Sequence, residues 1–189
     1  MKEITRKHRE KIKAQKAFVL WFTGLSGAGK TTLAIALEHS LHKMGKHTYI
    51  LDGDKFRETL NKDLGFSLKD REENIRRIGT ISLATVDAGL ITLVTLISPF
   101  RSSRDSVRAM HAPKDFIEVY VNCSLEECEK RDVKGLYYKA RQGIIKEFTG
   151  ISSPYEPPIN PEIVIDTAKL DLKSSVQTIL KYLKANKYI

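Results

Sequence analysis

A glycine-rich segment between an apolar run and a helical pattern constrains this chain more than any other feature. Residues 24–31 read GLSGAGKT and match the pattern G-x-x-x-x-G-K-[ST]. The apolar run 17–23 leads directly into the motif, and residues 32–41 leave it with helical spacing of apolar residues. Strand, glycine-rich loop and helix in this order are the context of a phosphate-binding loop. This context disfavours the alternative of a glycine turn with an incidental lysine, so the sequence predicts nucleoside triphosphate binding.

The residues of this loop have separate expected roles. Glycines let successive backbone N–H groups surround phosphate oxygens, and the helix N-terminus adds the positive end of its dipole. Lys30 is expected to reach the β- and γ-phosphates, and the Thr31 hydroxyl is expected to bind Mg²⁺. The expected ATP-binding residues of the loop are Gly24, Leu25, Ser26, Gly27, Ala28, Gly29, Lys30, Thr31 and Thr32.

Apolar, strand-like runs alternate with helical patterns along the whole chain. Strands are expected at 17–23, 47–51, 90–97, 116–122 and 162–166. Helices are expected at 30–44, 55–62, 68–87, 102–110, 124–131 and 171–186. The alternation predicts an α/β fold, a parallel five-stranded sheet with helices on both faces and ligands at the carboxyl ends of its strands. A chain of 189 residues fits one domain, at 17–189, preceded by a basic arm at 1–16.

The net charge of +9 raises the question of a nucleic-acid partner. Much of the excess lies in residues 1–16, which could form a solvated helix, a flexible arm or a patch that attracts anions. No nucleic-acid motif follows, and aromatic residues are not interleaved with the basic ones. An enzyme with two polyanionic substrates would also be basic. We therefore expect small-molecule substrates and no nucleic-acid partner.

Composition also bears on the cellular compartment. No apolar run approaches the roughly 20 residues that span a bilayer, and the N-terminus lacks the apolar segment of a signal peptide. Cys123 and Cys128 provide neither a disulfide framework nor zinc-ligand spacing. A cytoplasmic protein without a membrane partner is expected.

Two carboxylates follow the second expected strand. Asp52 and Asp54 stand at its end, whereas the third strand lacks the terminal aspartate of a usual Walker B motif. One of the two could organise Mg²⁺, and the other could accept the proton of an attacking hydroxyl. Asp-Gly-Asp is also common turn chemistry. The neighbouring Arg57 favours the functional interpretation.

Three further groups of residues suggest a second anionic ligand. Arg71 and Asn74 share a helical face and could grip an oxyanion and a nucleoside, although a generic R-x-x-N is more often a solvated, salt-bridged helix. Basic residues around glycine at about 131–150 predict a lid that closes over phosphates. Phe66 and Phe148 could stack on a purine, although phenylalanine is more often core.

A series of motifs resembles the adenylylsulfate (APS) kinase family. The similarity runs from about residue 18 to residue 166, with Val133 where many members have proline and Phe100 where some have tyrosine. The motifs, in chain order, are GLSGAGKTT, LDGDKFR, LGFSLKDREENIRRIG, ISPFRSSRD, RDVKGLY, FTGISSPYE and NPEI.

The resemblance implies a P-loop kinase fold, usually in a homodimer. It implies transfer of the γ-phosphoryl group of ATP to the 3′-hydroxyl of APS with Mg²⁺, giving PAPS and ADP in sulfate assimilation. The implied catalytic residues are Lys30, Asp52, Asp54 and Ser98, with Thr31 and Asp52 at the metal and Arg131 at ATP. The implied APS-binding residues are Asp54, Arg57, Phe66, Arg71, Asn74, Ile97, Ser98, Pro99, Phe100, Lys134, Gly135, Leu136 and Phe148.

The role of Ser98 has two interpretations. Descriptions of the family often assign this serine a phosphoserine intermediate. In-line transfer needs only positioning and charge stabilisation, so a serine relay is unnecessary when donor and acceptor meet directly. We expect direct transfer, with the Ser98 hydroxyl hydrogen-bonded to the substrate.

Other functional classes are less compatible with the motifs. A GTPase would need an NKxD motif after a DxxG, but here Asn61-Lys-Asp63 precedes Asp132-Val-Lys-Gly135. A polynucleotide-binding P-loop protein would show salt-dependent affinity for nucleic acid. A kinase for another small acceptor is the nearest enzymatic alternative.

Overall fold

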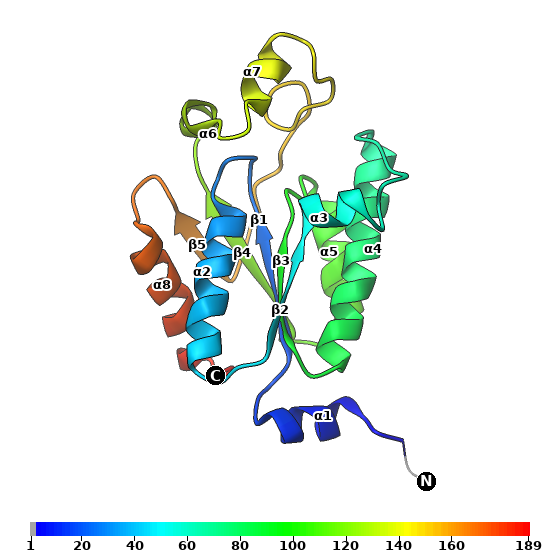
Figure 1. The fold of residues 1–189 in the computed structure, drawn as a ribbon, viewed down its shortest axis with the longest axis vertical. Coiled ribbons are helices and arrows are strands. Elements are labelled where there is room, and N and C mark those ends of the chain that lie inside the picture. The colour runs from blue at the N-terminus through cyan, green and yellow to red at the C-terminus, as the bar shows by residue number, and fades with distance from the viewer. Residues whose placement is uncertain (1–2) are drawn as a thin grey trace.

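The computed structural model describes residues 3–189, which contain a five-stranded parallel sheet between two helical layers (Figure 1). The strand order is β2-β3-β1-β4-β5, and each neighbouring pair is parallel. The strands are β1 (Phe18–Thr23), β2 (Thr48–Asp52), β3 (Ile91–Thr95), β4 (Phe116–Asn122) and β5 (Ile163–Asp166). Because the strands are parallel, their carboxyl ends meet at one edge of the sheet.

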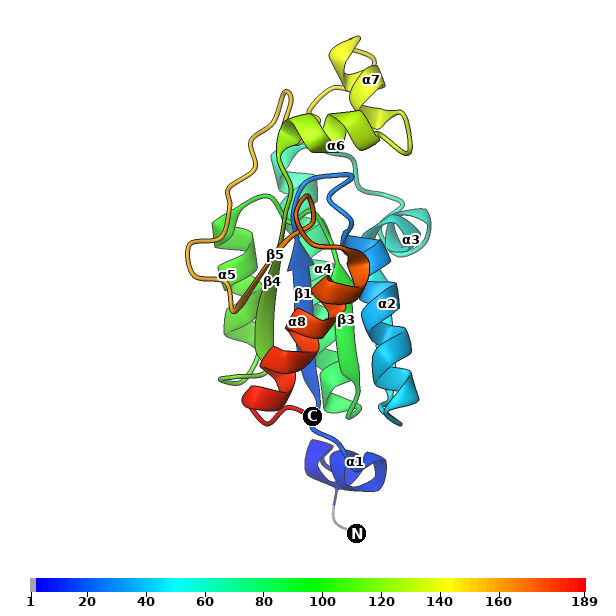
Figure 2. The same ribbon diagram turned by 90° about the vertical axis from the view of Figure 1, so that its left-hand side faces the viewer.

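Helices α2 and α8 cover one face of the sheet, and α4 and α5 cover the other (Figures 1 and 2). The helices are α1 (Arg6–Lys13), α2 (Lys30–Lys43), α3 (Gly53–Glu58), α4 (Leu68–Asp87), α5 (Arg101–Met110), α6 (Leu125–Arg131), α7 (Leu136–Arg141) and α8 (Leu172–Ala185). The sequence prediction of an α/β fold with a five-stranded parallel sheet is confirmed.

Strand β1 lies at the centre of the sheet and is buried at every position. Its alternate residues enter two separate cores, with Phe18 and Leu20 on the α2/α8 side and Val19 and Trp21 on the α4/α5 side. Burial on both faces explains why this strand reads as a continuous apolar run instead of an alternating one. The strand therefore holds the loop that follows it on a rigid support.

The helix expected at 55–62 differs from the one observed. Helix α3 begins at Gly53 and ends at Glu58. Asp52 is its N-cap, because the carboxylate accepts hydrogen bonds from the backbone amides of Asp54 (3.0 Å) and Lys55 (3.4 Å). Capping by the last residue of β2 starts the helix two residues early and fixes the direction of the chain as it leaves the sheet.

The basic segment at the N-terminus contains a helix that packs against the body. Helix α1 lies at the pole opposite the carboxyl ends of the strands (Figure 1). Arg6 pairs with Asp115 and donates to the carbonyl of Ala17, and Arg9 pairs with Asp87 at 2.7 Å. The sequence left open a solvated helix, a flexible arm or an anion-attracting patch. The structure has a helix, which ion pairs hold against the body.

Helices α6 and α7 lie above the carboxyl ends of the strands, where the lid is expected (Figures 1 and 2). Helix α7 was not expected, since residues 136–141 show no apolar periodicity. It begins after Gly135, whose φ of +63° suits glycine at an N-cap. Within residues 3–189, no helix combines the length and the hydropathy that a membrane span requires.

Candidate active site

The loop between β1 and α2 has a geometry that only glycine permits at its first position. Gly24 has a φ of +151°, and a Cβ atom there would collide with the carbonyl oxygen of Val121 on β4. Gly29 has a φ of +96° and is the N-cap of α2. The helix therefore begins with free backbone amides directed toward the loop, which is the arrangement that binds phosphate.

Lys30 spans this loop. Its Nζ donates to the carbonyl oxygens of Gly24 (3.0 Å) and Leu25 (2.8 Å). Burial lowers the pKa of Lys30 to about 8, and the nearby carboxylates Asp52 and Asp54 offset this only in part. A phosphate anion in the loop would raise the pKa again and so favour the charged form of the ammonium.

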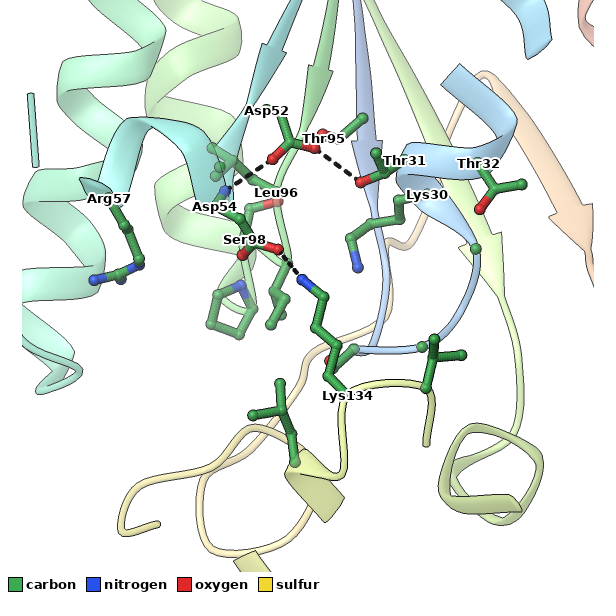
Figure 3. Close-up of a pocket in the computed structure, with 18 of the residues that line it drawn as sticks. Lys30, Thr31, Thr32, Asp52, Asp54, Arg57, Thr95, Leu96, Ser98 and Lys134 are labelled. Atoms are coloured by element: carbon green, nitrogen blue, oxygen red, sulfur yellow. Dashed lines mark hydrogen bonds and ion pairs between the residues drawn. The ribbon is translucent and has the colours of Figure 1, made fainter. Parts of the chain in front are cut away.

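Asp52 is fully hydrogen-bonded (Figure 3). Besides the two amides of α3, its carboxylate accepts from the hydroxyls of Thr31 and Thr95, each at 2.9 Å. Burial alone would raise the pKa of Asp52, but these hydrogen bonds outweigh it and the pKa lies below its ordinary value. Asp52 therefore stays ionised at neutral pH and is poorly suited to accept a proton.

The oxygen atoms around Asp52 fit a magnesium ion. In the part of the chain that the structure describes, no group of three or more His, Cys, Asp or Glu could by itself hold a metal. The Thr31 hydroxyl and the Asp52 carboxylate are instead a sparse set of hard oxygen donors. Mg²⁺ retains several waters and binds substrate phosphates, so such a set suits it.

Asp54, unlike Asp52, is exposed and contacts the segment where the lid is expected. Its carboxylate pairs with Lys134, which extends toward it from the loop before α7 (Figure 3). The hydrogen bond to Asp54 raises the pKa of Lys134. The pair thus joins the segment expected to be a lid to the residues that follow β2, and it leaves Asp54 accessible from the cavity.

One cavity of about 300 Å³ joins most of the predicted residues. The phosphate loop and α3 line one part of it, and α4, the segment after β3 and residues from the segment 132–137 line the rest. The predicted residues that line it are Ser26, Gly27, Gly29, Lys30, Thr31, Thr32, Asp52, Asp54, Arg57, Arg71, Asn74, Ile97, Ser98, Pro99, Lys134 and Leu136. The predicted residues that do not line it are Gly24, Leu25, Ala28, Phe66, Phe100, Arg131, Gly135 and Phe148.

Two arginines in this cavity lack an acidic partner. Arg71 is buried and donates to the carbonyl oxygens of Phe66 and Glu147, while Arg57 donates to that of Gly65 at 2.9 Å. Neither forms an ion pair with a carboxylate among residues 3–189. Burial lowers the pKa of both guanidinium groups. Two desolvated cations without a counter-ion favour binding of an anion.

The two candidate stacking residues have different environments. Phe66 is 53% exposed, and the Arg57 guanidinium lies 4.3 Å from its ring centroid. Phe148 is buried in the core and packs edge-on against Tyr137, with 5.0 Å between ring centroids. The Tyr137 hydroxyl donates to the carbonyl of Ser26 at 2.9 Å. Tyr137 therefore links Phe148 to the phosphate loop.

Arg131 lies on the other side of the phosphate loop. Its guanidinium donates to the carbonyl oxygen (2.9 Å) and the hydroxyl (3.1 Å) of Thr167, which follows β5. The Thr167 hydroxyl in turn donates to the carbonyl of Ala28 at 2.9 Å. Arg131 is therefore placed beside the loop and outside the main cavity.

The structure also reveals partners of predicted residues that the sequence did not indicate. Asn61, taken from the sequence as part of a decoy motif, is buried and donates to the Asn74 side chain at 2.9 Å. Ser98 has a φ of +39° and accepts a hydrogen bond from the indole of Trp21 at 3.0 Å. Arg104 donates to the carbonyl of Ser98 at 2.6 Å. The ISPFRSSRD motif contains two arginines, and this was the feature of the sequence that could have indicated a buried cation near Ser98.

The fold and the site together define a P-loop phosphotransferase. A parallel sheet presents a glycine-rich loop with its lysine and threonine, an aspartate that holds the threonine, and a second group of cations across one cavity. Such a site holds a nucleotide at one end and an anionic acceptor at the other.

Comparisons with known proteins identify the family. A family model described as adenylylsulphate kinase matches residues 16–166. The adenylyl-sulfate kinase of Staphylococcus epidermidis is 56% identical over 187 residues, which cover 99% of this chain and 94% of the relative. That of Oceanobacillus iheyensis is 60% identical, with 96% and 91% covered. The chain belongs to the adenylylsulphate kinase family and is an ATP-dependent kinase.

Solved structures agree with this assignment. The Mycobacterium tuberculosis APS kinase CysC in complex with AMPPNP and APS superposes with a TM-score of 0.87 at 42% identity, covering 90% of this chain and 99% of that one. A hexameric APS kinase from Thiobacillus denitrificans superposes with a TM-score of 0.72 at 34% identity, covering 97% of this chain and 32% of that one. The P-loop kinase fold expected from the resemblance is confirmed.

Proposed function

We propose that this kinase transfers the γ-phosphoryl group of ATP to the 3′-hydroxyl of APS, giving PAPS and ADP in sulfate activation. The observation that carries the proposal is the pair Arg57 and Arg71, two desolvated cations that line the same cavity as the phosphate loop. A phosphoryl acceptor that is itself a sulfated nucleotide supplies the anion that these side chains lack. The structure of the M. tuberculosis APS kinase in complex with both AMPPNP and APS supports the binding of two nucleotides.

On the ATP side, the backbone amides of residues 24–31 bind the phosphates and Lys30 compensates charge on the transferred group. Arg131, beside Thr167, contacts the nucleotide from the outer side of the loop. The residues that would hold Mg²⁺ are Thr31 and Asp52. The ion, when bound, neutralises charge on the β- and γ-phosphates.

On the APS side, Arg57 and Arg71 bind the anionic end, and Asn74 and residues 97–100 hold the nucleoside. Phe66 supplies an exposed ring for the adenine, and Phe148 bounds the same region from the core. Gly135 and Leu136 close the lid end of the cavity.

Transfer itself is direct in this proposal. The 3′-oxygen forms the bond to the γ-phosphorus while the bond from that phosphorus to the bridging oxygen breaks, and ADP leaves with the electron pair. Asp54 takes the proton of the 3′-hydroxyl, since Asp52 is held ionised by its four donors. Lys134 stabilises the charge as the lid excludes water. Ser98 donates a hydrogen bond to the substrate and carries no phosphate.

We also propose that the enzyme acts as a homodimer in the cytoplasm. The related T. denitrificans protein is described as hexameric, which supports an oligomer of some kind. Light scattering on the purified protein would give its mass. A mass of one chain at micromolar concentration would contradict the dimer.

The activity is tested by measuring ADP release with APS, AMP, CMP and gluconate as acceptors. Among these four acceptors, we expect turnover only with APS. Arg57 and Arg71 together can bind the sulfate group that the other three acceptors lack. Comparable turnover with AMP or gluconate would overturn the proposal. ATP without acceptor controls for hydrolysis.

A further inference from the structure

A buried polar network lies beneath the segment Ile97–Phe100, outside the residues so far assigned a role. It joins Trp21 on β1, Arg104 on α5 and Glu118 on β4. We propose that Trp21 and Arg104 are positioning residues for APS, which hold Ser98 in a left-handed conformation so that its hydroxyl faces the substrate. This inference rests on the proposed placement of APS against Ser98.

The conformation of Ser98 requires support from its surroundings. A φ of +39° is uncommon for a residue with a Cβ atom and persists only where the neighbouring structure enforces it. Ser98 is only 3% exposed, so its backbone carbonyl depends on donors from the protein. Trp21 donates to its hydroxyl at 3.0 Å, and Arg104 donates to its carbonyl at 2.6 Å. The Thr23 hydroxyl fixes the preceding carbonyl, that of Ile97, at 2.7 Å.

Arg104 is locked on three sides. Its side chain is 2% exposed, and its Nε donates to the Glu118 carboxylate at 2.6 Å. Its remaining terminal nitrogen donates to the carbonyl of Glu156 at 2.8 Å, and the Glu156 amide donates to the carbonyl of Pro99 at 2.8 Å. A planar guanidinium can satisfy all three acceptors at once, whereas a lysine ammonium cannot reproduce that fork. Arg104 therefore holds Ser98 directly, and it supports Pro99 through the backbone of Glu156.

Trp21 connects this segment to the phosphate loop. It lies on β1, whose last residue, Thr23, directly precedes Gly24 of the loop. The same strand therefore sets the position of the ATP-binding amides and of the donor to Ser98. Since the Ser98 oxygen already accepts the indole N–H, its own hydrogen is available to a substrate oxygen. The network thus fixes both the place and the donor direction of this hydroxyl.

The chain offers a direct probe, because Trp21 is its only tryptophan. The indole N–H gives a single side-chain resonance in a ¹H–¹⁵N spectrum of the whole protein. We expect APS, added to the AMPPNP complex, to shift this resonance, and Ser98→Ala to shift it without substrate. If APS leaves the resonance in place although it is turned over, APS does not lie against Ser98. That outcome would overturn both the placement and the inference built on it.

Kinetic measurements then test whether Trp21 and Arg104 position Ser98, separately from whether APS lies against Ser98. We expect Trp21→Phe and Arg104→Lys each to raise the KM for APS about tenfold, the effect of one lost hydrogen bond to a buried group, with the KM for ATP changed less than about twofold. Arg76→Lys, on the exposed face of α4 where Arg76 pairs with Glu73, is the control and should change neither. If both KM values stay at the wild-type level in a folded Trp21→Phe protein, the positioning role is wrong even where the NMR shift confirms the placement. That variant decides the matter alone if Arg104→Lys fails to fold.

Discussion

At the scale of single residues, Lys30 and Asp52 illustrate opposite effects of burial. Lys30 gains only carbonyl acceptors, so desolvation dominates and lowers its pKa to about 8. Asp52 gains four donors, so hydrogen bonding overcomes desolvation and lowers the pKa of the carboxyl group. The first group responds to an incoming anion, and the second is fixed before any ligand arrives.

This difference predicts proton uptake by Lys30 on nucleotide binding. Between pH 8 and its ordinary value of 10.5, the free enzyme holds Lys30 largely neutral, and a bound phosphate raises the pKa again. AMPPNP affinity should therefore fall as the pH rises above about 8. Calorimetry at pH 9 in buffers of different ionisation enthalpy should show uptake of up to one proton. Uptake of equal size in Lys30→Met would assign the proton to another group.

The two aspartates after β2 should respond differently to mutation. Asp54→Asn should lower kcat by about 100-fold or more through loss of the proton acceptor, with little change in stability because Asp54 is exposed. Asp52→Ala should lower the free energy of unfolding by about 2–4 kcal/mol, since it removes a helix cap and leaves the buried Thr95 hydroxyl without its acceptor. Urea denaturation and initial rates measure the two effects. Equal destabilisation by both changes would contradict the assignment.

At the scale of elements, the segment proposed as a lid contacts the site through two of its side chains. Lys134 meets Asp54 across the cavity, and Tyr137 at the start of α7 bonds to the phosphate loop. In the Lys134–Asp54 pair both side chains are more than half exposed. An exposed ion pair adds little to stability, so its proposed value lies in the reaction.

Lys134→Ala should therefore lower kcat by about tenfold or more and leave the midpoint of urea unfolding unchanged. Lys139→Ala, on the exposed side of α7, is the matched control and should keep full turnover. Turnover and unfolding can be measured on the same preparations. A wild-type rate in Lys134→Ala would remove this lysine from the reaction.

The elements also show what the sequence could and could not predict. Helix α4 agrees with its predicted bounds because Ser67 caps it and its periodicity is local. The contacts of Ser98 with Trp21, and of Arg71 with Glu147, join residues more than seventy positions apart. No local pattern encodes such pairs, so the positioning network required the structure. The cavity-lining residues were recognisable because strand ends and motifs are local features.

At the scale of the whole molecule, helix α1 and the active site occupy opposite poles (Figure 1). Arg6 ties α1 to Asp115 and Ala17, at the foot of the central strands. No residue of α1 lines the cavity. The N-terminal helix should therefore contribute to stability and not to turnover.

Accordingly, Arg6→Ala should lower the free energy of unfolding by about 1–3 kcal/mol, the cost of leaving a partly buried carboxylate and a carbonyl unpaired, while kcat and both KM values stay unchanged. Lys7→Ala, a change at an exposed position of the same helix, controls for helix propensity. A changed KM for APS in Arg6→Ala would indicate coupling between the poles.

The position of β1 has a consequence for biosynthesis. Its two partners, β3 and β4, both follow it in the chain, so its unbroken apolar segment leaves the ribosome long before either is made. Until β4 has emerged, this segment has the features of an aggregation hazard, namely high strand propensity and no charge. Nascent chains stalled before residue 116 should recruit chaperones, whereas chains released after β5 should not.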